Sequence, residues 1–156
     1  MSFSSYVLAA LALAPVEGSF ATFSSLHART GLQVDVTIGT KAVHDGAAVY
    51  WVSRVVRRRG SSDRTSETDS QSCPAILSLL RSLADLRLPR PSIPHLDTDT
   101  IIVTADGVDY RLTVPASYGS DTDGQVTFQS NVGTPLADWV ERANDELDKC
   151  VAPIWP

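Results

Sequence analysis

The 156-residue sequence contains few of the residues that most often bind metals or act as nucleophiles and bases. It holds two cysteines, three histidines and one methionine. The histidines, His27, His44 and His95, lie far apart and show no H-x-H or H-E-x-x-H spacing for a shared metal ion. No C-x-x-C pair, Walker loop, dinucleotide-binding glycine motif or G-x-S-x-G elbow occurs. We therefore expect no metal site and no cofactor, and we assign no catalytic residue.

Lysines and long apolar runs are also scarce, and acidic residues outnumber basic ones. The only lysines are Lys41 and Lys149, and the formal net charge is −5. An acidic balance argues against a general nucleic-acid-binding protein, which relies on basic surface. The apolar run at residues 6–14 is shorter than the roughly 20 residues that span a bilayer as a helix. We expect no nucleic-acid partner and no stable membrane span.

The same apolar run resembles the core of a secretory signal. Pro15 and the small-x-small triplet Ser19-Phe20-Ala21 follow it, although residues 2–5 contain no basic side chain. We predict a cleaved signal at residues 1–21 and a single domain at residues 22–156, located in the periplasm or secreted. The alternative is a cytoplasmic protein in which the run belongs to the core or to an oligomer interface.

Cys73 and Cys150 allow two hypotheses. In an exported chain two cysteines indicate one disulfide, whereas in a cytoplasmic chain they indicate core thiols. Cys73 opens a predicted helix and Cys150 lies on the apolar stripe of the last helix, so a bridge is geometrically possible. The competing hypothesis is a thiol-dependent enzyme or redox protein using Cys73, because a helix N-terminus lowers the pKa of a thiol. We favour the bridge, because the sequence places no histidine beside Cys73.

The first half of the chain predicts three strands. Residues 20–27 form the first, and alternating apolar and polar residues predict two more at 32–38 and 47–57. The pair Asp45-Gly46 between the last two favours a tight hairpin. Closing that turn places Val36 opposite Val55, Thr40 opposite Trp51 and Ala42 opposite Val49.

The second half predicts another hairpin, around Asp106-Gly107. A two-residue turn there pairs Ala105 with Val108, Val103 with Tyr110 and Ile101 with Leu112, with all apolar partners on one face. A short strand with Val126 and Phe128 follows the loop at residues 115–124.

Two helices complete the pattern. Pro74 suits the first turn of one helix, which ends near Arg87, and Thr134-Pro135 caps and starts the other. Residues 59–72 contain no apolar side chain and predict an exposed loop. The expected fold is α+β: an antiparallel sheet of five or six strands with two helices packed on one face, in the order β-β-β-α-β-β-β-α.

A weak sign of duplication accompanies this order. Asp45-Gly46 precedes Cys73-Pro74 by the same number of residues as Asp106-Gly107 precedes Thr134-Pro135. The two helix sequences do not align well, so a true repeat remains an open question.

Two charged segments are candidate binding surfaces. Arg54, Arg57, Arg58 and Arg59 could form a patch for an anion or a partner, or could be a solvated strand end that blocks edge pairing. The acidic side chains of the last helix could form a docking face for a basic partner, or a solvated helix face. These are Asp138, Glu141, Asp145 and Asp148.

The sequence thus favours a small exported bacterial protein that binds an unidentified protein or small ligand in the cell envelope without catalysis. The alternatives are the Cys73 enzyme or redox protein, and a cytosolic structural subunit.

Overall fold

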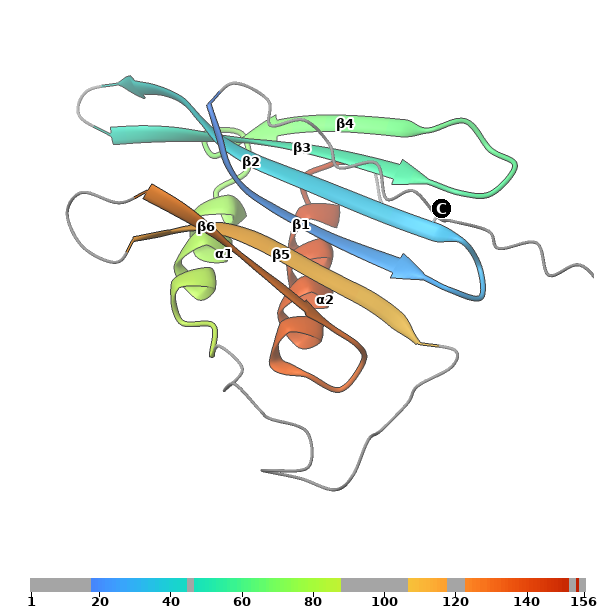
Figure 1. Ribbon diagram of the computed structural model, residues 1–156. Coiled ribbons are helices and arrows are strands. Elements are labelled where there is room, and N and C mark those ends of the chain that lie inside the picture. Colours follow the sequence, from blue (N-terminus) through green and yellow to red (C-terminus); the bar gives the residue numbers. More distant parts are fainter. Residues whose placement is uncertain (1–17, 45–46, 88–106, 118–122, 152–153, 155–156) are drawn as a thin grey trace, which may run out of the picture.

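The computed structural model describes residues 18–44, 47–87, 107–117, 123–151 and 154. It contains one antiparallel sheet of six strands and two helices (Figure 1), which confirms the α+β prediction. In chain order the elements are β1 (Ser19–His27), β2 (Leu32–His44), β3 (Ala47–Arg57), β4 (Arg64–Asp69), α1 (Ala75–Ala84), β5 (Val108–Ser117), β6 (Asp123–Ser130) and α2 (Pro135–Asp148). Four strands precede α1 and two follow it, where three and three were predicted.

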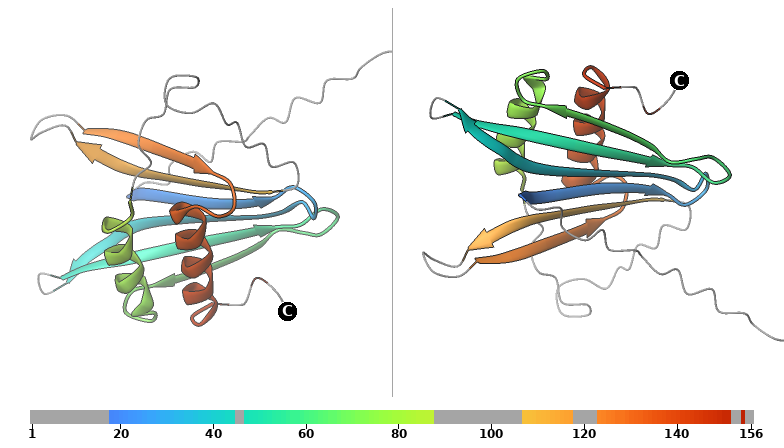
Figure 2. Two further views of the ribbon diagram at one scale, coloured as in Figure 1. Left: turned by 90° about the horizontal axis from the view of Figure 1, so that it is seen from below. Right: turned by 90° about the horizontal axis from the view of Figure 1, so that it is seen from above.

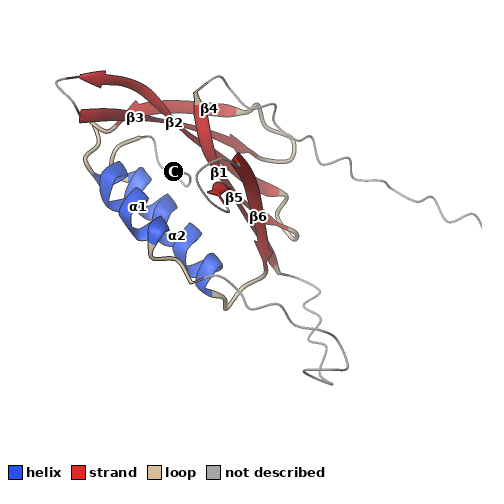
Figure 3. Cartoon of the chain, turned by 60° about the vertical axis from the view of Figure 1, so that its left-hand side comes forward, coloured by secondary structure: helices blue, strands red, loops and turns tan. Residues whose placement is uncertain are grey.

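The strand order in the sheet is β4-β3-β2-β1-β5-β6, and every neighbouring pair is antiparallel. Both helices lie on one face of this sheet, as predicted (Figure 3). The N-terminal strand β1 is therefore central, between β2 and β5. The first four strands form a continuous meander, and β5 and β6 are added on the other side of β1.

The β2–β3 hairpin is confirmed, with a corrected register. Ala42 lies opposite Val49 as predicted, but the ladder is irregular between Thr40 and Ala42. Beyond that point Val36 lies opposite Arg54 and Gly39 opposite Trp51. The predicted partners were wrong by one residue because a bulge inserts an extra residue without disturbing the apolar pattern on either side of it.

The predicted hairpin around Asp106-Gly107 is wrong in its pairing. Leu112 lies opposite Phe23 on β1 and opposite Phe128 on β6, so β5 has neighbours at both edges. Tyr110 is likewise paired on both sides and cannot take Val103 as a partner. Residues 101–105 lie outside the described residues. Alternation identified β5 correctly but could not distinguish a partner next in sequence from one at the N-terminus.

The predicted loop at residues 59–72 also requires correction, because it contains β4. This strand pairs with β3 at the edge of the sheet, with Thr65 opposite Val55 and Asp69 opposite Trp51. Arg64, Thr65 and Glu67 are exposed. An edge strand of polar and charged residues has no apolar alternation to reveal it, and its charges oppose pairing with another chain.

The core lies between the sheet and the helices. Phe23 of β1 meets Trp139 of α2 edge to face, with ring centroids 5.1 Å apart, and the Trp139 indole N–H donates to Ser82 of α1 at 3.0 Å. Thr134 caps α2 as predicted, accepting the N–H of Ala137 at 3.1 Å. The indole thus ties β1, α1 and α2 together.

The two helices run side by side (Figure 2), and a disulfide joins the start of α1 to the end of α2. Cys73 and Cys150 have Cα atoms 5.6 Å apart, within the usual range for a bridge. Cys73 is fully buried. The predicted pairing is confirmed. The helices are antiparallel: the bridge joins the start of α1 to the end of α2, and the Trp139–Ser82 contact joins the start of α2 to the end of α1.

The same strand–strand–helix unit occurs twice in the structure. Trp51 opposite Asp69 in the β3–β4 ladder corresponds to Arg111 opposite Gln129 in the β5–β6 ladder, each position 60 residues later. The buried helix residues follow the same interval. Ile76 of α1 matches Leu136 of α2, and Leu79 of α1 matches Trp139 of α2. The two Asp-Gly pairs are 61 residues apart, one more than the structural interval. A shift of one residue would match the open-face positions of one unit with the buried positions of the other.

Removal of the disulfide should lower the free energy of unfolding by about 4 kcal/mol, because the bridge spans 77 residues and restricts the unfolded chain. Urea unfolding of the oxidised protein and of the Cys73→Ala/Cys150→Ala variant, followed by circular dichroism, measures this loss. Reductant should destabilise the wild type and leave the double variant unchanged. Identical midpoints for oxidised wild type and variant would contradict a stabilising bridge.

Candidate functional site

The sheet face turned away from the helices, here called the open face, is mostly polar, with Leu26 and Val55 as half-buried apolar residues. Its side chains alternate with the buried residues Val34, Val36 and Ile38 on β2 and with their counterparts on the other strands. Among the described residues only Val132, which follows β6, is an exposed large hydrophobic residue. The open face includes Thr22, Ser24, Gln33, Asp35, Thr37, Trp51, Ser53, Arg57, Glu67, Asp69, Arg111, Thr113, Thr127 and Gln129.

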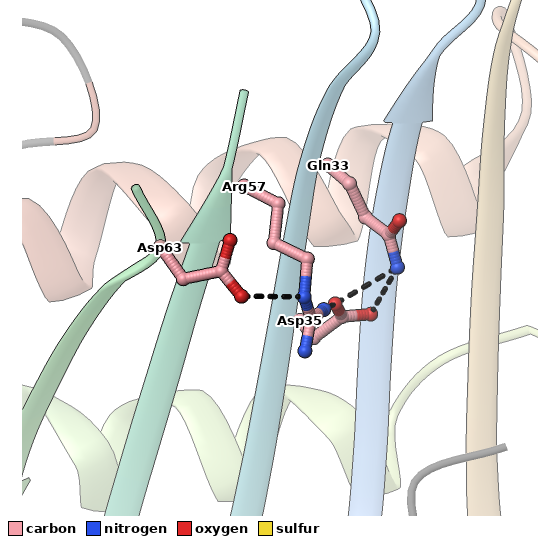
Figure 4. Close-up of polar contacts among 4 residues, drawn as sticks. All are labelled: Gln33, Asp35, Arg57 and Asp63. Atoms are coloured by element: carbon pink, nitrogen blue, oxygen red, sulfur yellow. Dashed lines mark hydrogen bonds and ion pairs between the residues drawn. The ribbon is translucent and has the colours of Figure 1, made fainter. Parts of the chain in front are cut away.

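Arg57 lies on the open face in a polar cluster (Figure 4). It forms ion pairs with Asp35, from β2, and with Asp63, with 3.2 Å between Arg57 Nε and Asp63 Oδ2. Gln33 Nε2 donates to both carboxylate oxygens of Asp35, at 2.9 and 3.1 Å. Two carboxylates thus neutralise this guanidinium, which is not poised for an external anion.

Arg54 lies on the opposite, helix-covered face. Its side chain is 1% exposed, and its Nη1 donates to Asp148 Oδ1 of α2 at 2.6 Å. Positions 54 and 57 are three apart on one strand, so they point to opposite faces. The four arginines therefore do not form the single patch that was proposed from sequence. Arg58 and Arg59, in the β3–β4 connection, remain at the surface.

The acidic docking face is also divided by the structure. Glu141 accepts a hydrogen bond from the buried Tyr110 hydroxyl, and Asp148 accepts from Arg54 and from the N–H of Ile154 at 3.2 Å. Asp138, Glu141 and Asp145 are exposed, and Asp148 is half-buried. Two of the four predicted docking carboxylates thus serve internal contacts, which helical spacing alone did not reveal.

Ile154, which follows α2, is held by two polar contacts. Arg64 of β4 donates to the carbonyl of Ile154 at 2.7 Å, and the Ile154 side chain is buried. Together with the Asp148 contact, this bond seats Ile154 between α2 and the β4 edge. The sheet is therefore joined to α2 by the Arg54–Asp148 pair and to Ile154 by Arg64.

A hollow at the β3–β4 end of the sheet contains Trp51. Three indole atoms, Cε2, Cζ2 and Nε1, lie 2.4–2.5 Å from where a Cβ at Gly39 would stand, so the ring rests over this glycine. The hollow has a volume of about 660 Å³. Its lining residues are Lys41, Trp51, Val52, Glu67, Thr68, Asp69 and Ser72. Sequence reasoning missed this site, although a lone glycine inside a strand can mark such a close approach.

Asp69 is held in its ionised form beside this hollow. Its carboxylate accepts the backbone N–H groups of Ser72 at 3.0 Å and Gln71 at 3.2 Å, and it pairs with Lys41 at 3.2 Å. The Ser72 N–H and then the Lys41 ammonium lower the pKa of Asp69. The hollow thus carries a negative charge held by backbone N–H groups, paired with the positive charge of Lys41.

The described part of the chain contains no free thiol and no cluster of metal-binding side chains. Its cysteines are both bonded, so Cys73 has no thiol in this state, and its His, Cys, Asp and Glu side chains form no group able to hold a metal ion. Neither described helix is long and apolar enough to cross a membrane. Of the three histidines that could act as a base for Cys73, His95 lies outside the described residues.

Comparison with known proteins adds no assignment: no protein family, curated protein or solved structure matches this chain.

Replacement of Asp148 by asparagine should lower the free energy of unfolding by about 2 kcal/mol, because buried Arg54 loses a charged acceptor. The effect is smaller than for a fully buried pair, since the Asp148 side chain is 27% exposed. Asp145→Asn, at an exposed position of the same helix, is the matched control and should change stability by less than about 0.5 kcal/mol. Equal urea midpoints for the two variants would rule out the pair as a source of stability.

Tyr110 should make stability fall at alkaline pH. Burial and the hydrogen bond to Glu141 raise the pKa of its hydroxyl above the usual value of about 10. The unfolded chain therefore releases this proton first, so the contribution is complete below about pH 10 and is lost as pH rises through the folded-state pKa. Thermal unfolding from about pH 9 to about pH 11 should show a shallower decline for Tyr110→Phe than for wild type.

An ultraviolet titration supplies the control for this prediction. At about pH 11 the folded wild type and folded Tyr110→Phe should show equal numbers of ionised tyrosines, whereas in urea the wild type should show one more. An additional ionised tyrosine in the folded wild type would contradict the raised pKa of Tyr110.

Proposed function

We propose that this chain is an exported, non-catalytic binding protein of the bacterial envelope or exterior, which engages its ligand or partner through the open face of its sheet. The observation that carries the proposal is the Cys73–Cys150 pair at disulfide distance. Disulfides persist in oxidising compartments and are rare in the cytoplasm. The apolar run at residues 6–14 supports the same location.

The distribution of surfaces supports binding. Both helices cover one face, and two carboxylates of α2 hold Tyr110 and Arg54. The open face presents hydroxyl, amide and charged groups together with the indole of Trp51. Such a face suits recognition of a polar ligand or partner, because its groups can exchange hydrogen bonds with water for hydrogen bonds with the bound molecule.

The fold favours signal cleavage ahead of Gly18. Ala21 is 2% exposed and lies opposite Ile38 in the β1–β2 ladder. A cut after Ala21, as the small-x-small triplet suggested, would remove Ser19–Ala21 from the central strand. A cut ahead of Gly18 would leave β1 intact.

Intact-mass measurement after expression in a bacterial host tests this proposal. The protein is alkylated with and without prior reduction. We expect a signal to be removed by a cut at or before residue 17, so that Gly18 is retained. We also expect two cysteines that are alkylated only after reduction. A full-length chain with two freely alkylated thiols would overturn the export proposal. It would favour the cytosolic subunit and make the reactivity of Cys73 relevant again.

A further inference from the structure

The Trp51 hollow has a preorganised aromatic surface. Because Gly39 has no side chain, the indole lies directly over the β2 backbone, and the neighbouring strand limits its movement. A ring held in this way loses little conformational freedom when a ligand stacks on it. The hollow, at about 660 Å³, falls within the range of small-molecule sites.

The groups around the ring are mixed in charge and in hydrogen-bonding role. Lys41 can only donate, the carboxylates of Glu67 and Asp69 can only accept, and the hydroxyl of Ser72 can do either. An anion would be repelled by the two carboxylates, and a cation by Lys41. A neutral molecule with many hydroxyl groups avoids both penalties and can satisfy donors and acceptors alike.

We propose that this hollow, formed by Trp51, Gly39, Lys41, Glu67 and Asp69, binds a neutral carbohydrate. The apolar C–H face of a pyranose ring stacks on the exposed indole face, and the ring hydroxyls accept from Lys41 and donate to Glu67 and Asp69. The Lys41–Asp69 ion pair, with 3.2 Å between Lys41 Nζ and Asp69 Oδ2, positions one donor and one acceptor beside the ring. This inference rests on the proposed function and names the ligand class for its open face.

A glycan array that displays neutral, acidic and amino sugars tests the inference on the purified protein. The best neutral oligosaccharide is then measured in solution by titration calorimetry, and saturation-transfer NMR identifies the sugar protons at the protein surface. We expect selective binding of neutral pyranose glycans, with the strongest transfer to the C–H protons of one ring face. No binding on the array, or a preference for sulfated and carboxylated glycans, would overturn it.

Variants locate the site. Trp51→Ala should abolish binding, and Glu67→Gln, on the exposed edge strand, should weaken it about tenfold through loss of a charged acceptor. Gly39→Ala should also weaken binding, because its Cβ displaces the indole. Arg111→Ala, which changes the open-face position matching Trp51 in the second unit, should bind like wild type. Unchanged binding by both Trp51→Ala and Glu67→Gln would place the sugar elsewhere and contradict the inference.

The result can be separated from that of the export test. A disulfide-bonded, processed protein that binds a protein partner but no glycan would preserve the proposed function and refute the carbohydrate site. Glycan binding by a full-length chain with free thiols would support the site and refute the proposed compartment.

Discussion

The pairing of β1 with β2 on one edge and with β5 on the other is the constraint on which the structure depends. It joins the meander of residues 19–69 to the hairpin of residues 108–130, and among the described strands it is the one link between these parts of the sheet. The β1–β5 ladder brings together residues that are far apart in sequence, so its formation carries a larger loop-closure entropy than a hairpin. Phe23, on this strand, then supplies the surface on which Trp139 packs.

The two helices that cover the sheet are joined to each other at both ends. At one end the Trp139 indole donates to Ser82, and at the other Cys73 and Cys150 join the antiparallel helices covalently. Between these points α2 directs Glu141 to Tyr110 and Asp148 to Arg54. Each of these polar contacts lies over the sheet, so α2 is fixed by specific bonds as well as by apolar packing.

This use of the helices leaves the opposite face of the sheet for recognition. The two strand–strand–helix units have similar buried positions but different open faces: Trp51 and Asp69 in the first correspond to Arg111 and Gln129 in the second. The glycine that accommodates an indole is on β2, beside the first unit. The hollow is therefore a property of one half of the sheet, which is why we place the carbohydrate site there.

Local patterns in the sequence determined the two helices and every described strand except β4, both helix starts and the disulfide partners. Alternation and Asp-Gly or Pro signals act over a few residues, and two cysteines permit only one bridge. Tertiary structure alone decided that β5 pairs with β1, that the polar segment 64–69 forms an edge strand, and that the β2–β3 register shifts near Lys41. Strand ladders are made by backbone groups that every sequence provides, so side-chain patterns do not name the partner. The burial of Arg54 beneath Asp148 and the seating of Trp51 on Gly39 follow from those ladders and from the packing of α2, and are therefore visible only in the folded chain.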